Sequence, residues 1–262
     1  MLRMSKNNLK VVILAGGYGT RLGTLTKLKP KPMVDVCGKP IIEHIIQLYL
    51  RSGFSNFIIC GGYKNEVIKD YFKKKYRKNI LLNNKNETFI KKNNFSIRIV
   101  NTGKNSLTGG RIKRIRKYVE KDAFFHMTYG DGLSNVNINR LTKFHLKNKK
   151  FATVTTVKVQ VPQERFGVVY FKNKNTVKEF VEKPDIKEIF INGGFFVLSS
   201  KIFKFIKDDF TRWEAKPLER IAKQKQLAAF KHTGFWKCMD TIRDKKYLER
   251  FKNKKFPWNI IN

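Results

Sequence analysis

Acidic residues are scarce in this chain of 262 residues: 20 Asp and Glu stand against 56 Lys and Arg, giving a formal net charge of +36. Cysteine is scarce too, and Cys37, Cys60 and Cys238 are too far apart for a zinc motif or a disulfide framework. No apolar run approaches the roughly 18 residues of a membrane span. The apolar run at residues 11–15 is shorter than that of a signal peptide. We therefore expect a cytoplasmic protein with reduced thiols and no membrane span.

Apolar residues, in contrast, are plentiful. Hydrophobic residues make up 41% of the chain, and 22 of the residues are Phe. This content excludes a disordered basic tail and is enough for one large core. No linker divides the sequence, so we expect a single domain over residues 1–262.

The basic charge raises the question of nucleic-acid binding. Basic residues exceed acidic ones in both halves of the chain, and lysines outnumber arginines, although specific phosphate and base contacts favour arginine. The sequence carries no helix-turn-helix, zinc-finger or RNP signature. Two interpretations stay open: a lysine-rich composition without specific function, and attraction to polyanions such as nucleotides.

Short apolar runs alternate with helical patterns along the first half. Strands are predicted at residues 11–14, 57–60, 95–100, 124–128 and 152–157, and helices at 40–52, 65–76, 110–119 and 138–146. This order predicts an α/β fold with a Rossmann-like, mostly parallel mixed sheet and helices on both faces. Closely spaced strands at 168–171, 177–181 and 195–198 predict an antiparallel or mixed addition to that sheet. The Lys- and Asn-rich stretch 73–94 is predicted as an exposed insertion with at most two short strands.

A glycine-rich turn follows the first strand directly, in the order Leu14-Ala15-Gly16-Gly17-Tyr18-Gly19-Thr20-Arg21-Leu22. Glycines at the carboxyl end of a strand let backbone N–H groups approach an anion. The P-loop pattern is absent, and the dinucleotide fingerprint would need glycine where Leu22 stands. Arg21 could grip phosphate oxygens with a bidentate fork. A plain strand-to-helix turn is the alternative.

Two further segments carry charged residues in restricted settings. Pro30 and Pro32 flank Lys31 and restrict its backbone, which favours a fixed cation over a solvated surface lysine. Asp131, between two glycines after the strand at 124–128, suits a magnesium ion, although a turn aspartate is equally common there. Asp240 is by itself a plausible helix N-cap.

These motifs together resemble the sugar-1-phosphate nucleotidyltransferase family, from Lys10 over nearly the whole chain. The segments 107–111 and 234–241 are most similar to the cytidylyl branch, which forms CDP-glucose from CTP and α-D-glucose 1-phosphate. The resemblance implies a nucleotide-binding half over about residues 10–157 and a sugar-phosphate-binding half, with a C-terminal helix, over about 158–262. The other matching segments are 61–64, 129–132, 182–184 and 191–196.

The resemblance also implies roles for individual residues. Arg21, Lys31, Lys183 and Asp131 are implied as catalytic, and Asp131 and Asp240 as ligands of Mg²⁺. The implied nucleotide and sugar contacts are Leu14, Ala15, Gly16, Gly17, Tyr18, Gly19, Thr20, Ser106, Arg111, Gly130, Gly167, Glu182, Asn192 and Gly193. The local sequence also allows simpler interpretations. Arg111 could lie on a solvated basic helix face, and Glu182 and Lys183 could form an exposed ion pair. Gly167 and Gly193 could belong to ordinary turns.

The implied reaction is a direct in-line displacement without a covalent intermediate, because no residue arrangement indicates a nucleophile. The same reaction with UTP or dTTP is an alternative, against which the segment Thr108-Gly109-Gly110-Arg111 argues. A non-catalytic nucleic-acid-binding or regulatory protein is the alternative of another class. The expected partners are CTP, a sugar 1-phosphate and further copies of the chain in a homo-oligomer, such as a hexamer. Tyr18 stands where the family commonly has an apolar residue.

Overall fold

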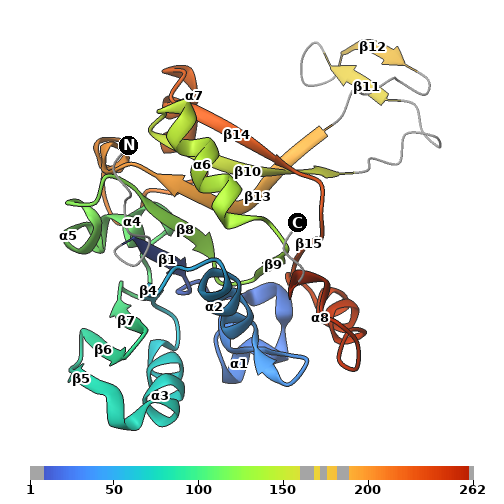
Figure 1. Ribbon diagram of the computed structural model, residues 1–262. Helices are drawn as coiled ribbons and strands as arrows, with labels where there is room; N and C mark the ends of the chain where they lie inside the picture. The colour runs from blue at the N-terminus through green and yellow to red at the C-terminus, as the bar shows by residue number, and fades with distance from the viewer. Residues whose placement is uncertain (1–8, 160–167, 172–175, 182–188, 260–262) are drawn as a thin grey trace.

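A nine-stranded sheet forms the centre of the molecule (Figure 1). The structure is a computed structural model and describes residues 9–159, 168–171, 176–181 and 189–259. The strands lie in the order β14 (Leu227–His232), β10 (Ala152–Val159), β13 (Ile189–Leu198), β8 (Phe125–Tyr129), β1 (Lys10–Leu14), β4 (Asn56–Gly61), β7 (Phe95–Asn101), β6 (Glu87–Lys92) and β5 (Ile80–Asn83).

The middle of the sheet is parallel. β1 pairs in parallel with β4 and β8, β4 with β7, and β10 with β14. β13 and β6 run antiparallel to both of their neighbours. Since parallel strands end at the same edge, the loops after β1, β4 and β8 meet there. The predicted mostly parallel mixed sheet is confirmed.

Helices cover both faces of the sheet. They are α1 (Thr24–Leu28), α2 (Ile41–Arg51), α3 (Asn65–Lys75), α4 (Thr108–Arg114), α5 (Arg116–Val119), α6 (Ile138–Asn148), α7 (Lys216–Lys223) and α8 (Ile242–Glu249).

The two faces bury separate hydrophobic cores, because neighbouring strand residues point to opposite sides. Val11 and Ile13 of β1 pack in the core that contains residues of α2, α3 and α6. Val12 and Leu14 pack in the other core, which contains residues of α4, α5 and α7. Strands buried on both faces carry continuous apolar runs, as β1 does. No helix among the described residues is long and apolar enough to cross a bilayer.

Three small sheets complete the fold: β2 (Asp35–Val36) with β3 (Lys39–Pro40), β11 (Val168–Phe171) with β12 (Val177–Val181), and β9 (Gly132–Ser134) with β15 (Trp236–Cys238). The last pair matters for function. Cys238 lies opposite Gly132, and the Met239 N–H donates to the Asp131 carbonyl at 2.9 Å. This pairing brings residues about one hundred positions apart to the same place.

Three local predictions need correction. The stretch 73–94 is largely exposed and contains the two predicted short strands, but these strands, β5 and β6, extend the main sheet, and Ile90 of β6 is completely buried. The predicted helix 110–119 is two helices, α4 and α5, separated at Ile115. Of the closely spaced strands, β13 joins the main sheet, whereas β11 and β12 pair only with each other. The alternation of apolar residues was too short to reveal these pairings.

Candidate active site

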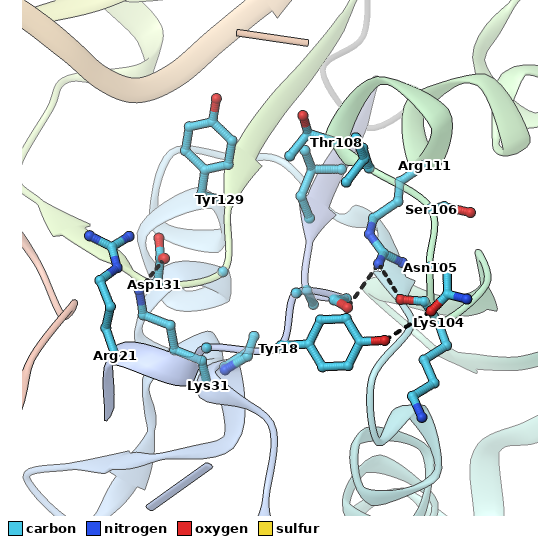
Figure 2. Close-up of a pocket in the computed structure, with 18 residues that line it drawn as sticks. Tyr18, Arg21, Lys31, Lys104, Asn105, Ser106, Thr108, Arg111, Tyr129 and Asp131 are labelled. Carbon is cyan, nitrogen blue, oxygen red and sulfur yellow. Dashed lines mark hydrogen bonds and ion pairs between the residues drawn. The ribbon is translucent and has the colours of Figure 1, made fainter. Parts of the chain in front are cut away.

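The carboxyl end of the parallel strands opens into a pocket of about 300 Å³ (Figure 2). The glycine-rich loop after β1 and residues 129–131 after β8 form one part of its wall, and the segment 104–108 with Arg111 forms the other. The predicted residues Leu14, Ala15, Gly16, Gly17, Tyr18, Gly19, Arg21, Lys31, Ser106, Arg111, Gly130 and Asp131 all line this pocket. Thr20 follows Gly19 as an exposed residue that starts a short 3-10 helix.

Backbone contacts fix the glycine-rich loop. The Ala15 N–H donates to the Cys60 carbonyl at 3.0 Å, and the Leu14 carbonyl accepts from the Gly130 N–H at 2.9 Å. Gly19 has a φ of 65°, a left-handed conformation that favours glycine. The loop is therefore held by strands β4 and β8 on its two sides.

Arg111 lines the pocket and does not lie on a solvated helix face. It is buried, and its guanidinium donates to the Gly16 carbonyl, to the Thr102 hydroxyl and to the Gly103 carbonyl, each at 2.8 Å. Burial lowers the pKa of Arg111. The solvated basic face is wrong for this residue. Arg111 ties the glycine-rich loop to the segment after β7 and so shapes the pocket.

The position of Arg111 explains two glycines. A Cβ atom on Gly16 would lie 2.1 Å from Arg111 Nη1, and one on Gly62 would lie 2.3 Å from the same atom. Gly17, in contrast, has nothing within 4 Å of such an atom. Gly16 and Gly62 are thus needed for the arginine, while Gly17 faces open space at the pocket.

Tyr18 joins the two walls of the pocket. Its hydroxyl donates to Asn105 Oδ1 at 2.9 Å, and its ring lies against that of Tyr63 with centroids 5.1 Å apart. Figure 2 shows this link between the glycine-rich loop and the segment 104–108. Asn105 was not predicted from the sequence, because a polar loop residue carries no signal of its own.

Lys31, Asp131 and Asp240 form an ionic cluster at the edge of the pocket. Lys31 Nζ lies 2.6 Å from Asp131 Oδ2 and 2.5 Å from Asp240 Oδ1, and its side chain is only 11% exposed. Burial alone would lower the pKa of Lys31. The Asp131 carboxylate, together with Cys238 and Asp240, outweighs burial and raises the pKa of Lys31 above its usual value. Arg21, 72% exposed, reaches Asp240 at 3.1 Å. The structure therefore brings Arg21, Lys31, Asp131 and Asp240 together.

The helix-cap interpretation of Asp240 is also wrong. Thr241 caps α8: its hydroxyl accepts from the Asp244 N–H, and the Asp244 carboxylate accepts from the Thr241 N–H in return. This reciprocal arrangement satisfies the first turn of the helix. Asp240 is left free to face Asp131.

A second pocket of about 240 Å³ adjoins the first, and Arg21, Tyr129 and Asp131 line both. Its other walls include Asn192, Gly193, Trp236 and Asp240. The Trp236 indole N–H donates to the Gly193 carbonyl at 2.7 Å, which holds β15 against β13. The structure thus places the predicted residues Asn192 and Gly193 across from Asp131. Gly167, Glu182 and Lys183 lie outside the described residues.

Tyr129 lines both pockets, and Glu214 holds its hydroxyl. Its hydroxyl donates to Glu214 Oε1 at 2.5 Å, while Glu214 Oε2 accepts from the Thr108 hydroxyl at 2.6 Å. Burial, together with the Glu214 carboxylate, raises the pKa of the Tyr129 phenol. Neither Tyr129 nor Glu214 is among the residues with a predicted site role. The scarcity of acidic residues was the one signal that could have pointed to Glu214.

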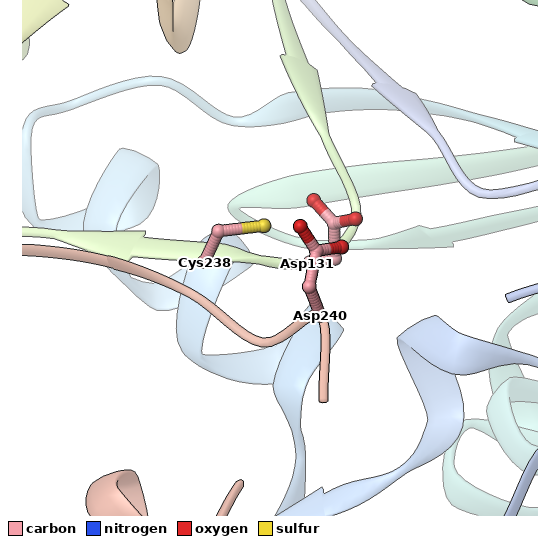
Figure 3. Close-up of side chains that lie close together, drawn as sticks. All are labelled: Asp131, Cys238 and Asp240. Carbon is pink, nitrogen blue, oxygen red and sulfur yellow. The ribbon is translucent and has the colours of Figure 1, made fainter. Parts of the chain in front are cut away.

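The donor atoms fit a hard divalent metal ion. Carboxylate oxygens of Asp131 and Asp240 and the sulfur of Cys238 all lie within 4.8 Å of one another (Figure 3). Burial, together with the Asp131 carboxylate, raises the pKa of the Cys238 thiol, so the sulfur is a poor ligand and the two carboxylates dominate. In this structure the Lys31 ammonium balances the charge of the two carboxylates.

Comparison with known proteins agrees with this geometry. Residues 10–245 match the sequence profile "Nucleotidyl transferase". The chain belongs to the nucleotidyl transferase family. Members of this family use a divalent metal ion, which agrees with the paired carboxylates.

Curated relatives and a solved structure narrow the likeness. The chain is 44% identical to glucose-1-phosphate cytidylyltransferase of Salmonella typhimurium, over 95% of this chain and 98% of that one. It is 39% identical to a probable glucose-1-phosphate cytidylyltransferase of Bacillus subtilis, over 90% of this chain and 93% of that one. The structure of HddC from Yersinia pseudotuberculosis complexed with GMP-PN matches with a TM-score of 0.66 at 25% identity, covering 92% of this chain and 98% of that one. The predicted family and α/β fold are confirmed.

Proposed function

We propose that this chain transfers the cytidylyl group of CTP to α-D-glucose 1-phosphate and releases CDP-glucose and pyrophosphate. The observation that carries the proposal is the pair of adjoining pockets that share Arg21 and Asp131. A group transfer between two phosphorylated substrates needs two such pockets with a charged boundary. The 44% identity to a glucose-1-phosphate cytidylyltransferase supports the choice of substrates.

CTP would occupy the pocket built on the glycine-rich loop. Gly17 leaves open space beside the pocket, and the loop before it is fixed by β4 and β8. Backbone N–H groups in such a loop can approach phosphate oxygens. We infer that the base lies toward Ser106 and Thr108 and the triphosphate toward Arg21. In this arrangement Arg111 shapes the base side from behind, through the carbonyls that it holds.

The sugar phosphate would occupy the second pocket. Asn192 and Gly193 on β13 line it, and we infer that Glu182, Lys183 and Gly167 complete it. This division assigns the nucleotide to residues of about 10–157 and the sugar phosphate to those of about 158–262. Asp131, at the boundary, belongs to both pockets.

The reaction needs little acid–base help from the protein. An oxygen of the sugar phosphate, already ionised at neutral pH, attacks the α-phosphorus of CTP and forms the new P–O bond. The bond from the α-phosphorus to the oxygen that bridges to the β-phosphate breaks, and pyrophosphate leaves with the electron pair. Catalysis then rests on orientation and on neutralised charge.

Cations of this chain supply that neutralisation. Arg21 is exposed at the pocket and free to turn toward the leaving pyrophosphate. Lys31 has its backbone fixed between two prolines, and its ammonium would serve the α-phosphate. Lys183 would hold the incoming sugar phosphate. The contacts of Lys31 and Arg21 would strengthen as negative charge moves toward the leaving pyrophosphate, which accelerates the step, whereas Lys183 would position the attacking phosphate.

Asp131 and Asp240 would hold Mg²⁺, the hard cation that prefers carboxylate and phosphate oxygens. The bound metal supplies charge neutralisation at the reacting phosphate oxygens. Tyr129, fixed by Glu214, keeps the boundary between the pockets in place beside Asp131.

The proposal is tested by turnover with four nucleoside triphosphates, CTP, UTP, dTTP and GTP, each with glucose 1-phosphate and Mg²⁺, following pyrophosphate. We expect CTP to give the highest kcat/KM. A higher kcat/KM with UTP or dTTP would show that the chain is a uridylyl or thymidylyl transferase instead of a cytidylyl transferase. Absence of turnover with every triphosphate, together with salt-sensitive binding to duplex DNA or RNA, would favour a nucleic-acid-binding protein.

We also propose that the chain works in the cytoplasm as a homo-oligomer. A cytoplasmic place gives access to CTP and agrees with the free thiols of Cys37, Cys60 and Cys238. Sedimentation of the purified chain at several concentrations tests the oligomeric state, with a monomer at all concentrations as the contrary result.

A further inference from the structure

The paired carboxylates of Asp131 and Asp240 carry their own cation. They meet because β9 pairs with β15, although like charges at this separation repel each other. Lys31 donates to both, at 2.6 Å and 2.5 Å, from a side chain that is 11% exposed. Arg21, the other cation that reaches Asp240, is 72% exposed. Lys31 is therefore the counter-ion built into the pair.

A divalent metal ion would need the same two carboxylates. Lys31 contacts Oδ2 of Asp131 and Oδ1 of Asp240, and these two carboxylates are the donors suited to a hard cation. Mg²⁺ binds oxygens at about 2.0–2.1 Å, so a metal on this pair would lie next to the ammonium. Two cations so close repel each other, and the two compete for one pair of carboxylates.

Only the end of the Lys31 side chain is free to leave. Lys31 begins a 3-10 helix, Lys31–Met33, after Pro30 and before Pro32, which fixes its backbone. Its Cβ atom packs at the glycine-rich loop, where a Cβ on Gly19 would lie 3.0 Å away. The flexible four-carbon stem nonetheless allows the ammonium to turn into the larger pocket, which Lys31 also lines.

We propose that Lys31 is an internal competitor for the metal: its ammonium holds the Asp131–Asp240 pair in the free chain and releases it when metal and nucleotide phosphates bind together. The inference rests on the proposed function for the identity of the metal site. Two consequences follow. The free chain binds a divalent metal weakly, and triphosphate oxygens give the displaced ammonium a new partner, so metal and nucleotide favour each other's binding.

The test measures Mn²⁺ binding to the full chain without nucleotide, by electron paramagnetic resonance of free Mn²⁺. Lys31→Met keeps the length of the side chain and removes its charge. We expect Lys31→Met to bind Mn²⁺ tighter than the parent chain by about tenfold or more. Lys31→Arg retains a cation and should keep the weak binding. Lys29→Met is the matched control, because Lys29 pairs with Asp35 away from the site.

Equal or weaker Mn²⁺ binding by Lys31→Met would overturn the inference, because Lys31 would then be neutral for the site or needed to build it. Adding Asp240→Asn to Lys31→Met separates this result from a failure of the metal site itself. If the double variant binds Mn²⁺ as tightly as Lys31→Met, the metal lies elsewhere and the proposed function loses its metal site.

Thermal unfolding of Lys31→Met and the parent chain shows whether the variant folds and provides a second test of the competition. With a chelator, Lys31→Met leaves two carboxylates without their buried cation, so we expect a lower Tm than in the parent chain. Mn²⁺ should restore it and raise the Tm of the variant more than that of the parent. An equal rise in both would contradict the competition. Lys31→Gln, neutral and able to donate to a carboxylate, replaces the variant if Lys31→Met does not fold.

Discussion

The two parts of the candidate site are built in opposite ways. Around the glycine-rich loop, the buried cation Arg111 is held by carbonyl and hydroxyl oxygens, and none of the ion pairs among the described residues includes it. At the pocket boundary, Lys31 is held by the two full negative charges of Asp131 and Asp240. Both cations are buried, so both lose water and must recover its hydrogen bonds from the protein.

The difference separates shape from chemistry. Carbonyl and hydroxyl partners fix Arg111 in one place, which suits a residue that shapes a pocket. Carboxylate partners hold Lys31 strongly, yet they are the groups that a metal also needs. We conclude that the first part of the site is rigid before substrate arrives, while the second exchanges partners during binding.

Metal removal should separate the two parts most completely. With excess chelator, turnover should fall to the background rate, because the Asp131–Asp240 pair would then hold no metal ion to neutralise the charge of the substrate phosphates. The Tm should stay within about 1 °C, since Lys31 and Arg21 balance the carboxylates without metal. Scanning calorimetry beside the turnover assay checks both; a large fall in Tm would show that metal is structural, contrary to the account.

Substituting the shared carboxylate should have the next largest effect. Asp131→Asn should lower kcat by roughly 10²-fold or more, because the metal and Lys31 both lose their common partner. Lys183→Ala should cause a loss of similar order through the sugar phosphate. Steady-state kinetics with circular dichroism checks activity and folding together. Asp35→Asn is the control, because Asp35 pairs with Lys29 and lines neither of the two pockets. Near-normal rates in both active-site variants would refute the assignment.

Gly16→Ala tests the rigid part. Its Cβ would lie 2.1 Å from Arg111 Nη1, so the guanidinium must move. Overpacking of this kind costs about 1–3 kcal/mol in the free energy of unfolding. Denaturant unfolding measures this cost, and Gly17→Ala is the matched control, because nothing lies within 4 Å of its added atom. Equal stability of the two variants would mean that Arg111 does not hold the loop.

Tyr18→Phe should have the smallest effect. The variant keeps the ring against Tyr63 and removes the hydrogen bond to Asn105. An exposed hydrogen bond is worth about 0.5–1 kcal/mol, so KM for CTP should rise about two- to fivefold, with KM for glucose 1-phosphate unchanged. Asn105→Ala should give the same shift, and the double variant no more than either alone. Additive effects would show that the link across the pocket does not matter for CTP.

The fold was largely predictable because apolar runs and helical spacing repeat along the first half. β1, β4 and β8 fall where the sequence places them, and so do α2, α3 and α6. The edge strand β5 and its neighbour β6 were not predicted as part of the sheet, since Lys- and Asn-rich strands have little apolar signal. β6 is held by its backbone ladder to β7 and by the burial of Ile90.

The site was predictable where neighbouring residues form it. The glycine-rich loop carries its own signal, whereas Asp240 showed only a helix-cap pattern and gained its metal role from the family resemblance. Its meeting with Asp131 depends on the pairing of β9 with β15, two strands of three residues each. The burial of Arg111 depends on carbonyls from three separate segments. Such contacts arise from tertiary structure and leave no pattern in the local sequence.

The central claim, transfer of a cytidylyl group to glucose 1-phosphate, is tested most directly by identifying the products. The purified chain is incubated with CTP, α-D-glucose 1-phosphate and Mg²⁺, and the mixture is followed by phosphorus-31 nuclear magnetic resonance and mass spectrometry. The account predicts CDP-glucose and pyrophosphate in equal amounts, with no pyrophosphate when the sugar phosphate is omitted. Release of CMP and pyrophosphate without the sugar phosphate, or no reaction at all, would contradict it.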